Sequence, residues 1–99
     1  MAKALTAIIA GGGLGGLATA AALARTGWRV TVFERQNELR ANGSGIYIWE
    51  NGLRVLEALG ACEDAIRDAF RGTHFEQRDN RNAIIESAAI PSDRRLMTT

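Results

Sequence analysis

Three glycines and one acidic residue have the types and the spacing to bind a dinucleotide. Gly11, Gly13 and Gly16 lie between an apolar run and a helix-like stretch, and Glu34 closes the next apolar run. In such a Gly-x-Gly-x-x-Gly turn the first glycine permits a tight bend, the second lets the backbone approach a pyrophosphate, and the third lets the helix pack closely. The N–H groups at the helix start can bind phosphate, and the acid can accept hydrogen bonds from ribose hydroxyls.

The segments around the glycines have the patterns of a strand, a helix and a second strand. Residues 3–10 are mostly apolar, as in a short buried parallel strand, and residues 29–33 are β-branched and aromatic. Residues 17–26 are alanine-rich and favour a helix that Gly27 ends. One face of this helix is expected to carry Leu17, Ala20, Ala21 and Ala24. The order predicts a Rossmann-like βαβ unit.

After Glu34 the pattern predicts a loop, an extended segment and a helix. Residues 35–45 are polar and contain glycine, and residues 46–49 are apolar and aromatic. Asn51 is the expected N-cap of the helix, and Gly60 is its expected end. Its inward face is expected to carry Leu53, Leu56 and Leu59.

The last third of the chain predicts a β-hairpin. Residues 63–70 favour a further helical turn or two. Residues 73–78 alternate in polarity, residues 83–87 are apolar, and the turn-rich residues 79–82 lie between them. No element is predicted for residues 96–99. Two parallel strands are fewer than a doubly wound domain needs, so residues 1–99 are expected to be the N-terminal part of a larger protein.

A membrane segment is the main alternative interpretation of the N-terminal region. Residues 4–24 carry no charge, contain Gly-x-x-x-Gly spacings and could imitate a signal peptide. However, the run is dominated by alanine and glycine, and its glycines would interrupt the centre of a spanning helix. The sequence therefore predicts no membrane association.

Composition narrows the possible partners. The chain has 12 basic and 11 acidic residues, a net charge of +1, and no basic block suited to nucleic acid. Cys62 is the only cysteine, so no internal disulfide can form, and a reducing, cytoplasmic location is expected. His74 is the only histidine, and nothing near it has metal-ligand spacing, so no metal is expected.

The motifs together resemble the class A flavoprotein monooxygenases, the single-component aromatic hydroxylases. The resemblance is carried by Glu34-Arg35, Leu39-Arg40, Gly43-Ser44-Gly45-Ile46 and the pattern from Asn51 to Gly60. One segment is similar to the pyridine-ring branch of this family, which includes 2-methyl-3-hydroxypyridine-5-carboxylic acid oxygenase. Its sequence is Gly-Ile-Tyr-Ile-Trp-Glu-Asn-Gly-Leu-Arg-Val-Leu-Glu. The implied fold is α/β: a Rossmann-like βαβ FAD-binding unit, then a helix and a β-hairpin, as the incomplete N-terminal part of a two-dinucleotide flavoprotein fold.

This resemblance implies non-covalent FAD and assigns residues to it. Glu34 would contact the adenosine ribose and Arg35 would lie near the adenine. Arg40 would reach the pyrophosphate or ribityl chain, although a solvated loop charge is the alternative. Tyr47 would lie near the isoalloxazine and face the substrate, with ordinary core packing as its alternative. The residues implied at the pyrophosphate are Gly11, Gly13, Leu14, Gly15 and Gly16.

The implied reaction is hydroxylation of a small aromatic substrate with O2, with NADH or NADPH as the reductant of FAD. Phe75 stands where the pyridine branch tends to carry tyrosine, which leaves the substrate open. Most catalytic groups of the family lie further along its chain, so the rest of the polypeptide is an expected partner. Two alternatives remain: another FAD-dependent oxidoreductase of the same fold, and a non-catalytic, truncated dinucleotide-binding module.

Overall fold

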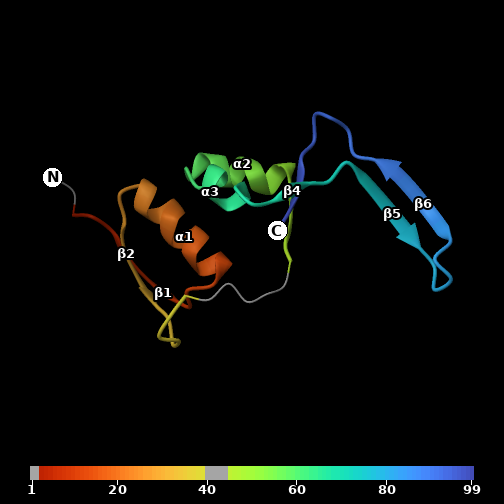
Figure 1. The fold of residues 1–99 in the computed structure, drawn as a ribbon. Coiled ribbons are helices and arrows are strands. Elements are labelled where there is room, and N and C mark those ends of the chain that lie inside the picture. The colour runs from red at the N-terminus through yellow and green to blue at the C-terminus, as the bar shows by residue number, and fades with distance from the viewer. Residues whose placement is uncertain (1–2, 40–44) are drawn as a thin grey trace. The chain divides into compact units, whose positions relative to one another are not determined.

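The computed structural model describes residues 3–39 and 45–99 of the chain (Figure 1). The chain divides into two compact units, Met1–Gly43 and Ser44–Thr99. Each unit has its own sheet structure and is described by itself.

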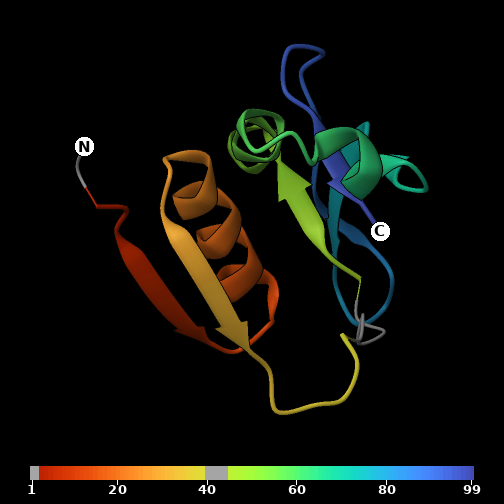
Figure 2. The same cartoon turned by 90° about the vertical axis from the view of Figure 1, so that its left-hand side faces the viewer.

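The first unit is the predicted βαβ unit. Strands β1 (Thr6–Ala10) and β2 (Arg29–Phe33) pair in parallel from Thr6 opposite Arg29 to Ala10 opposite Phe33. Helix α1 (Leu14–Arg25) connects them and lies across one face of the pair (Figure 2). Alternate strand residues are half-buried, as expected for a sheet with one covered face.

Helix α1 begins earlier than the sequence predicts, and its covered face agrees with the prediction only in part. It starts at Leu14 instead of Leu17, because the chain turns into the helix directly after Gly13. Ala20 and Ala21 are half-buried as predicted, together with Gly16 and Leu23, whereas Leu17 and Ala24 are exposed. Residues spaced by three and four share one helix face, and here Gly16 and Leu23 take the places predicted for Leu17 and Ala24 on that face.

The end of α1 confirms the role predicted for Gly27. Thr26 caps the helix, and the N–H of Gly27 donates to the carbonyl of Ala24 at 3.1 Å. Gly27 has φ of +87°, in the left-handed region that favours glycine. After this turn the chain continues directly into β2.

The second unit combines a three-stranded antiparallel sheet, two short helices and a separate hairpin. The sheet has the strand order β3-β7-β4, and β5 pairs with β6. The elements, in chain order, are β3 (Tyr47–Trp49), α2 (Glu50–Ala58), α3 (Cys62–Ile66), β4 (Phe70–Arg71), β5 (His74–Arg78), β6 (Ile84–Ala89) and β7 (Leu96–Thr98).

The core of this unit forms where α2 meets the central strand. Leu53 is fully buried, and it packs with Cys62 and Met97. Leu56 is partly buried against this cluster and Leu59 is also half-buried, so the predicted inward face of α2 is confirmed. Cys62 is a free cysteine, and its burial is typical of a small apolar core residue.

Several predicted boundaries in this unit are wrong. Helix α2 begins at Glu50 with the extended residue Trp49 as its cap and no side-chain cap bond, so Asn51 lies inside the helix. Gly60, with φ of +71°, does end the helix as predicted. Helix α3 is confined to Cys62–Ile66, and Phe70 belongs to a strand.

The predicted hairpin is confirmed. Asp79 Oδ1 accepts hydrogen bonds from the N–H groups of Arg81 and Ala83, each at 2.8 Å, and these bonds shape the turn. Asn82 takes a positive φ of 64°, which asparagine tolerates.

Across the described residues, 3–39 and 45–99, no helix is long and apolar enough to cross a membrane.

Candidate functional site

The glycine turn connects β1 to α1, and its first residue has a backbone conformation that favours glycine. Gly11 has φ of +107°, and its N–H donates to the carbonyl of Phe33 at 2.7 Å. This bond continues the β1–β2 pairing into the turn. Gly13 caps α1, and its carbonyl accepts the N–H of Leu17 at 2.9 Å.

The space around each glycine distinguishes packing from openness. A Cβ on Gly16 would lie 2.0 Å from the carbonyl oxygen of Gly11, so no side chain fits there. A Cβ on Gly13 would meet nothing within 4 Å, so its backbone is open to an incoming group. The close packing predicted for Gly16 is therefore present, with the turn itself as the nearest neighbour.

Gly12 is a constrained position that the fingerprint spacing does not select. A Cβ there would lie 2.9 Å from Leu39 Cδ2 and 3.1 Å from Glu34 Oε2. The only sequence signal is that three glycines are consecutive. The contact explains why position 12 is glycine, since a larger residue would displace the side chain of Glu34.

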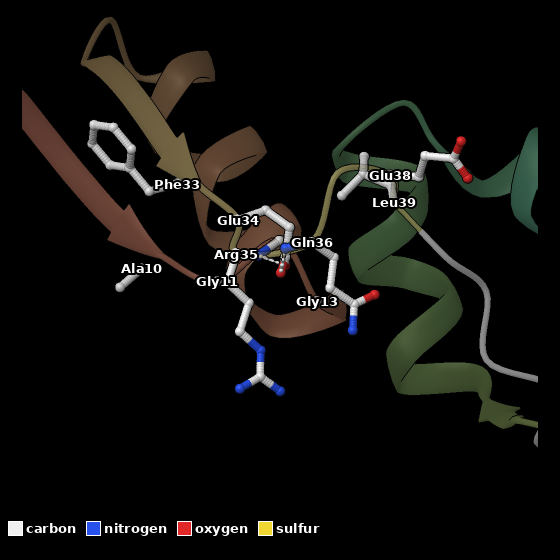
Figure 3. Close-up of a pocket in the computed structure, with 10 residues that line it drawn as sticks. Ala10, Gly11, Gly13, Phe33, Glu34, Arg35, Gln36, Glu38 and Leu39 are labelled. Atoms are coloured by element: carbon white, nitrogen blue, oxygen red, sulfur yellow. Dashed lines mark hydrogen bonds between the residues drawn. The ribbon is translucent and has the colours of Figure 1, made fainter.

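The carboxylate of Glu34 is held against the turn by two backbone hydrogen bonds (Figure 3). Oε2 accepts the N–H of Gly12 at 2.7 Å, and Oε1 accepts the N–H of Gln36 at 3.1 Å. The bond from Gln36, and then that from Gly12, holds the pKa of Glu34 below its usual value. Each oxygen keeps a further lone pair, so the ionised group can still accept ligand hydroxyls.

The start of α1 adds positive partial charge next to this carboxylate. The first turn of the helix contains no acidic residue. Its N–H groups, from Leu14, Gly15 and Gly16, have no carbonyl four residues earlier within the helix. A helix start of this kind attracts anions, phosphate in particular.

A cavity of about 620 Å³ opens beside the turn, within the usual size range of ligand sites. The side chain of Arg35 extends away from the Glu34 carboxylate (Figure 3). The residues that line the cavity are Ala10, Gly11, Gly12, Gly13, Phe33, Glu34, Arg35, Gln36, Glu38 and Leu39.

The structure brings some of the predicted site residues together and not others. Gly11, Gly13, Glu34 and Arg35 all line the cavity. Leu14, Gly15 and Gly16 belong to the adjoining helix start. Arg40 lies outside the described residues. Tyr47 belongs to the second unit, on β3, with 73% of its surface exposed, so it is not in the core.

Gln36, Glu38 and Leu39 are cavity-lining residues that sequence reasoning missed. They lie in a polar loop without periodicity, and only the return of that loop toward Gly12 brings them to the turn. Among the described residues, no group of histidine, cysteine, aspartate and glutamate is arranged to hold a metal ion.

Comparison with known proteins agrees with this geometry. The model of the NAD(P)-binding Rossmann-like domain matches residues 9–60, more than half of the chain. A probable 2-heptyl-3-hydroxy-4(1H)-quinolone synthase of Rhodococcus erythropolis is 54% identical over 72 residues, which are 73% of this chain and 19% of that protein. A 3-hydroxybenzoate 6-hydroxylase of Klebsiella oxytoca is 42% identical over 79 residues, 80% of this chain and 20% of that protein.

Solved structures give the same result for the fold. The tetrameric form of 2-methyl-3-hydroxypyridine-5-carboxylic acid oxygenase matches 98% of this chain and 26% of its own, with a TM-score of 0.87 and 38% identity. Klebsiella pneumoniae HpxO, complexed with FAD and uric acid, matches 86% of this chain and 21% of its own, with a TM-score of 0.66 and 28% identity.

The chain belongs to the NAD(P)-binding Rossmann-like domain family and to the family of FAD-dependent aromatic monooxygenases. It corresponds to an N-terminal, dinucleotide-binding portion of these proteins. The resemblance found in the sequence, including the pyridine-ring branch, is thereby confirmed. The chain spans about a fifth of the length of the curated relatives it matches.

Proposed function

We propose that this chain forms the AMP and pyrophosphate part of the FAD site of a monooxygenase. That enzyme would hydroxylate an aromatic or N-heteroaromatic ring with O2 and NAD(P)H. The observation that carries the proposal is the pairing of an open Gly13 backbone with an anchored Glu34 carboxylate in one cavity. One feature suits a pyrophosphate and the other suits a ribose.

The pyrophosphate is assigned to the start of α1. Gly13 presents no side chain, and the first-turn amides of Leu14, Gly15 and Gly16 can donate to phosphate oxygens. Because no acid lies in the first turn, nothing on the helix offsets this attraction. Arg40 is proposed to supply a cation to the same group or to the ribityl chain.

The adenosine ribose is assigned to Glu34. Its two backbone bonds orient both carboxylate oxygens before a ligand arrives, and the lowered pKa keeps the group ionised. A phosphate on the ribose 2′ position would meet this negative charge, so the site favours FAD or NAD over NADP. Arg35, which lines the same cavity, is proposed to lie near the adenine.

We infer FAD and not NAD as the ligand because the names of two similar proteins specify FAD. Similar proteins include a putative FAD-dependent monooxygenase of Bacillus subtilis and a FAD-dependent urate hydroxylase of Klebsiella oxytoca. FAD, when bound, supplies the chemistry that accepts hydride from NAD(P)H and activates O2. The residues of this chain bind and orient that group.

Tyr47 is the residue of the second unit proposed to face the isoalloxazine and the substrate. Its side chain is exposed, so its ring and hydroxyl are available for contact. Phe75, on β5, has no hydroxyl to offer, and we infer that the substrate is not positioned by that residue through a hydrogen bond. The rest of a longer polypeptide would supply the remaining groups in a cytoplasmic enzyme.

A dinucleotide-binding module without catalysis of its own is the second candidate. It is favoured by the fact that the cavity described here offers groups for the AMP and pyrophosphate portion of a ligand. The two candidates share this binding site and differ in whether an aromatic substrate is turned over.

Titration of the isotope-labelled chain tests the binding site. FAD and ADP are expected to bind weakly, because the cavity buries little of the ligand surface. Their binding is expected to shift the amide signals of Gly11 to Gly16 and of Gln36. Adenosine 2′,5′-bisphosphate is expected to bind more weakly than adenosine 5′-monophosphate, from which it differs only by the 2′-phosphate, because that phosphate meets the charge of Glu34. Equal binding of the 2′-phosphate, or shifts confined to the second unit, would contradict the assignment.

Oxygen uptake separates the two candidates. A protein with the length of the relatives is expected to consume O2 in the presence of NAD(P)H and an aromatic substrate, and the 99-residue chain is expected not to do so. Binding without uptake in the longer protein would favour the non-catalytic module.

A further inference from the structure

The last six residues of the chain consist of three pairs of like residues. The pairs are Arg94-Arg95, Leu96-Met97 and Thr98-Thr99. In most strands one register is selected because polar and apolar residues alternate, and a one-residue slip would reverse the two faces. A sequence of pairs weakens that selection, since many positions receive a like residue after a slip.

Strand β7 nevertheless occupies one register between its two neighbours. Opposite β3, Thr98 pairs with Tyr47, Met97 with Ile48 and Leu96 with Trp49. Leu96 and Met97 are both buried, with 6% and 8% of their surfaces exposed. Burial at consecutive positions means that this strand has no polar face to define the register.

Arg95 is the residue that distinguishes the observed register. Its Nε and Nη2 donate to the two carboxylate oxygens of Glu50 at 2.8 and 2.7 Å, and its backbone N–H donates to the same group at 2.9 Å. Nη1 donates to Glu57 at 2.7 Å. The Arg95 and Glu50 side chains are 29% and 20% exposed, so water screens the pair only partly.

The position of this pair follows directly from the strand pairing. Glu50 follows Trp49, the last residue of β3, and Arg95 precedes Leu96, the first residue of β7. The ion pair is therefore the next step of the β3–β7 ladder. Arg94, by contrast, is exposed, and its N–H donates to the carbonyl of Pro91 at 3.0 Å.

A slip of β7 in one direction would abolish the ion pair. Leu96 would move beside Glu50, and Thr98 would take the core position of Met97. The carboxylate would lose its arginine, and a hydroxyl would be buried next to Leu53. Both changes oppose this slip.

A slip in the other direction would preserve both an arginine beside Glu50 and an apolar residue at the core position of Met97. Arg94 would replace Arg95 beside Glu50, and Leu96 would replace Met97 in the core. The main obstacle is Arg95 itself, whose charge would enter the buried site of Leu96. The native register therefore depends on one side chain in two ways, as a partner for Glu50 and as a charge that resists burial.

We propose that Arg95 is the positioning residue that sets the register of β7, and that Arg94 is a latent substitute for it. Replacing Arg95 with an apolar residue would remove the obstacle, so Arg94 would take over the pair with Glu50. The strand would then shift by one residue, and Met97 would replace Thr98 opposite Tyr47. Any consequence of that exchange for ligand binding at Tyr47 rests on the proposed function; the register itself does not.

Cross-strand proton contacts in the labelled 99-residue chain report the register. The N–H groups of Ile46 and Thr99 each donate to the other residue's carbonyl, both at 3.2 Å, so the next pair, Tyr47 and Thr98, is not hydrogen-bonded. Such pairs have the shortest Hα–Hα distances. The native chain is expected to show a Tyr47–Thr98 contact, and Arg95→Met a Tyr47–Met97 contact in its place or beside it.

Three further variants separate register selection from general stability. Arg94→Met is the matched control and is expected to keep the native contact. Arg95→Lys retains a charge that resists burial and is expected to rescue the native contact. Arg94→Met/Arg95→Met leaves neither register with an arginine for Glu50 and is expected to show less of the shifted contact than Arg95→Met. A native contact alone in Arg95→Met, or a shift in Arg94→Met, would overturn the proposal.

Disulfide trapping gives a second measurement if a variant is too unstable for spectroscopy. Tyr47→Cys/Thr98→Cys is expected to form a bridge in the native background, and Tyr47→Cys/Met97→Cys is expected to form one preferentially after Arg95→Met. Mass mapping of linked peptides distinguishes both from bridges to Cys62. We expect the ratio of the two bridges to change on the order of tenfold, the ratio that corresponds to about 1.4 kcal/mol. An unchanged ratio would overturn the proposal.

Discussion

The two units of this chain are organised by interactions of different range. In Met1–Gly43 the turn, the helix and the second strand follow each other directly, and the site is made from backbone groups and the Glu34 carboxylate. In Ser44–Thr99 the central strand comes last in the sequence, and Arg95 reaches Glu50 across 45 residues. Local order thus builds the candidate binding site, whereas a distant ion pair defines the other sheet.

This contrast shows where each unit tolerates substitution. The first unit depends on the absence of side chains at a few backbone positions. The second depends on the presence of particular side chains around a small core, Leu53, Cys62, Leu96 and Met97. Disruption of each unit should therefore need a different kind of change.

The largest effect is expected from Gly16→Val. Its Cβ would lie 2.0 Å from the Gly11 carbonyl, so either the helix or the turn must move. Overpacking of this kind costs about 1–3 kcal/mol or more. Amide exchange should show loss of protection in β1, α1 and β2 while the second unit keeps its own.

Gly15→Ala is the matched control for that experiment. No atom lies within 4 Å of a Cβ at Gly15, and alanine favours helix over glycine by about 1 kcal/mol. Protection in the first unit should be unchanged or higher. Equal loss in both variants would show that any side chain near the glycine turn disrupts the unit, and would contradict the role given to the contact between Gly16 and Gly11.

A binding defect without a folding defect is expected from Gly13→Val. The added Cβ meets no protein atom within 4 Å, but the side chain fills the space assigned to the pyrophosphate. The FAD content of the purified longer protein should fall, and ADP should no longer shift the amides of the 99-residue chain. A normal flavin content would contradict the role proposed for this loop.

Glu34→Ala is expected to have a smaller effect on the same site. Hydrogen bonds from ribose to a charged acceptor are lost, and FAD binding should weaken on the order of tenfold. The measurement is the FAD dissociation constant. Glu38→Gln, at another acidic residue of the cavity, should change it little. If both variants behave alike, the cavity depends on net charge and not on the anchored carboxylate.

The smallest effect is expected from acid on the second unit. The hydrogen bonds of the Arg95 side chain lower the pKa of Glu50 from 4.5 to about 2. A carboxyl with a lowered pKa adds stability above its unfolded pKa, and that stability is lost as the pH falls from about 4.5 toward about 2.

The two tryptophans allow this acid effect to be followed in one unit. Trp28 belongs to the first unit and Trp49 to the second, next to Glu50. In Trp28→Phe the fluorescence of Trp49 should report denaturant midpoints that fall across this pH window. Glu50→Gln should flatten the dependence, and an unchanged dependence would assign it to other groups.

The sequence by itself determined the elements that local chemistry defines. Gly11 and Gly27 adopt positive φ where glycine is favoured, and alternation with a turn-rich centre produced the hairpin. The βαβ unit and the family resemblance followed from such short-range patterns. The roles assigned to Glu34 and Tyr47 toward a ligand stay predictions.

Only the tertiary structure decided which distant residues meet. Gly12 gained its role because Glu34 and Leu39 return to the turn, and α2 begins at Glu50 instead of being capped by Asn51. Strand β7 is central although its sequence, made of like pairs, carries no alternation. A local pattern cannot encode a partner 45 residues away, because the free energy of that contact arises only when the chain has closed around it.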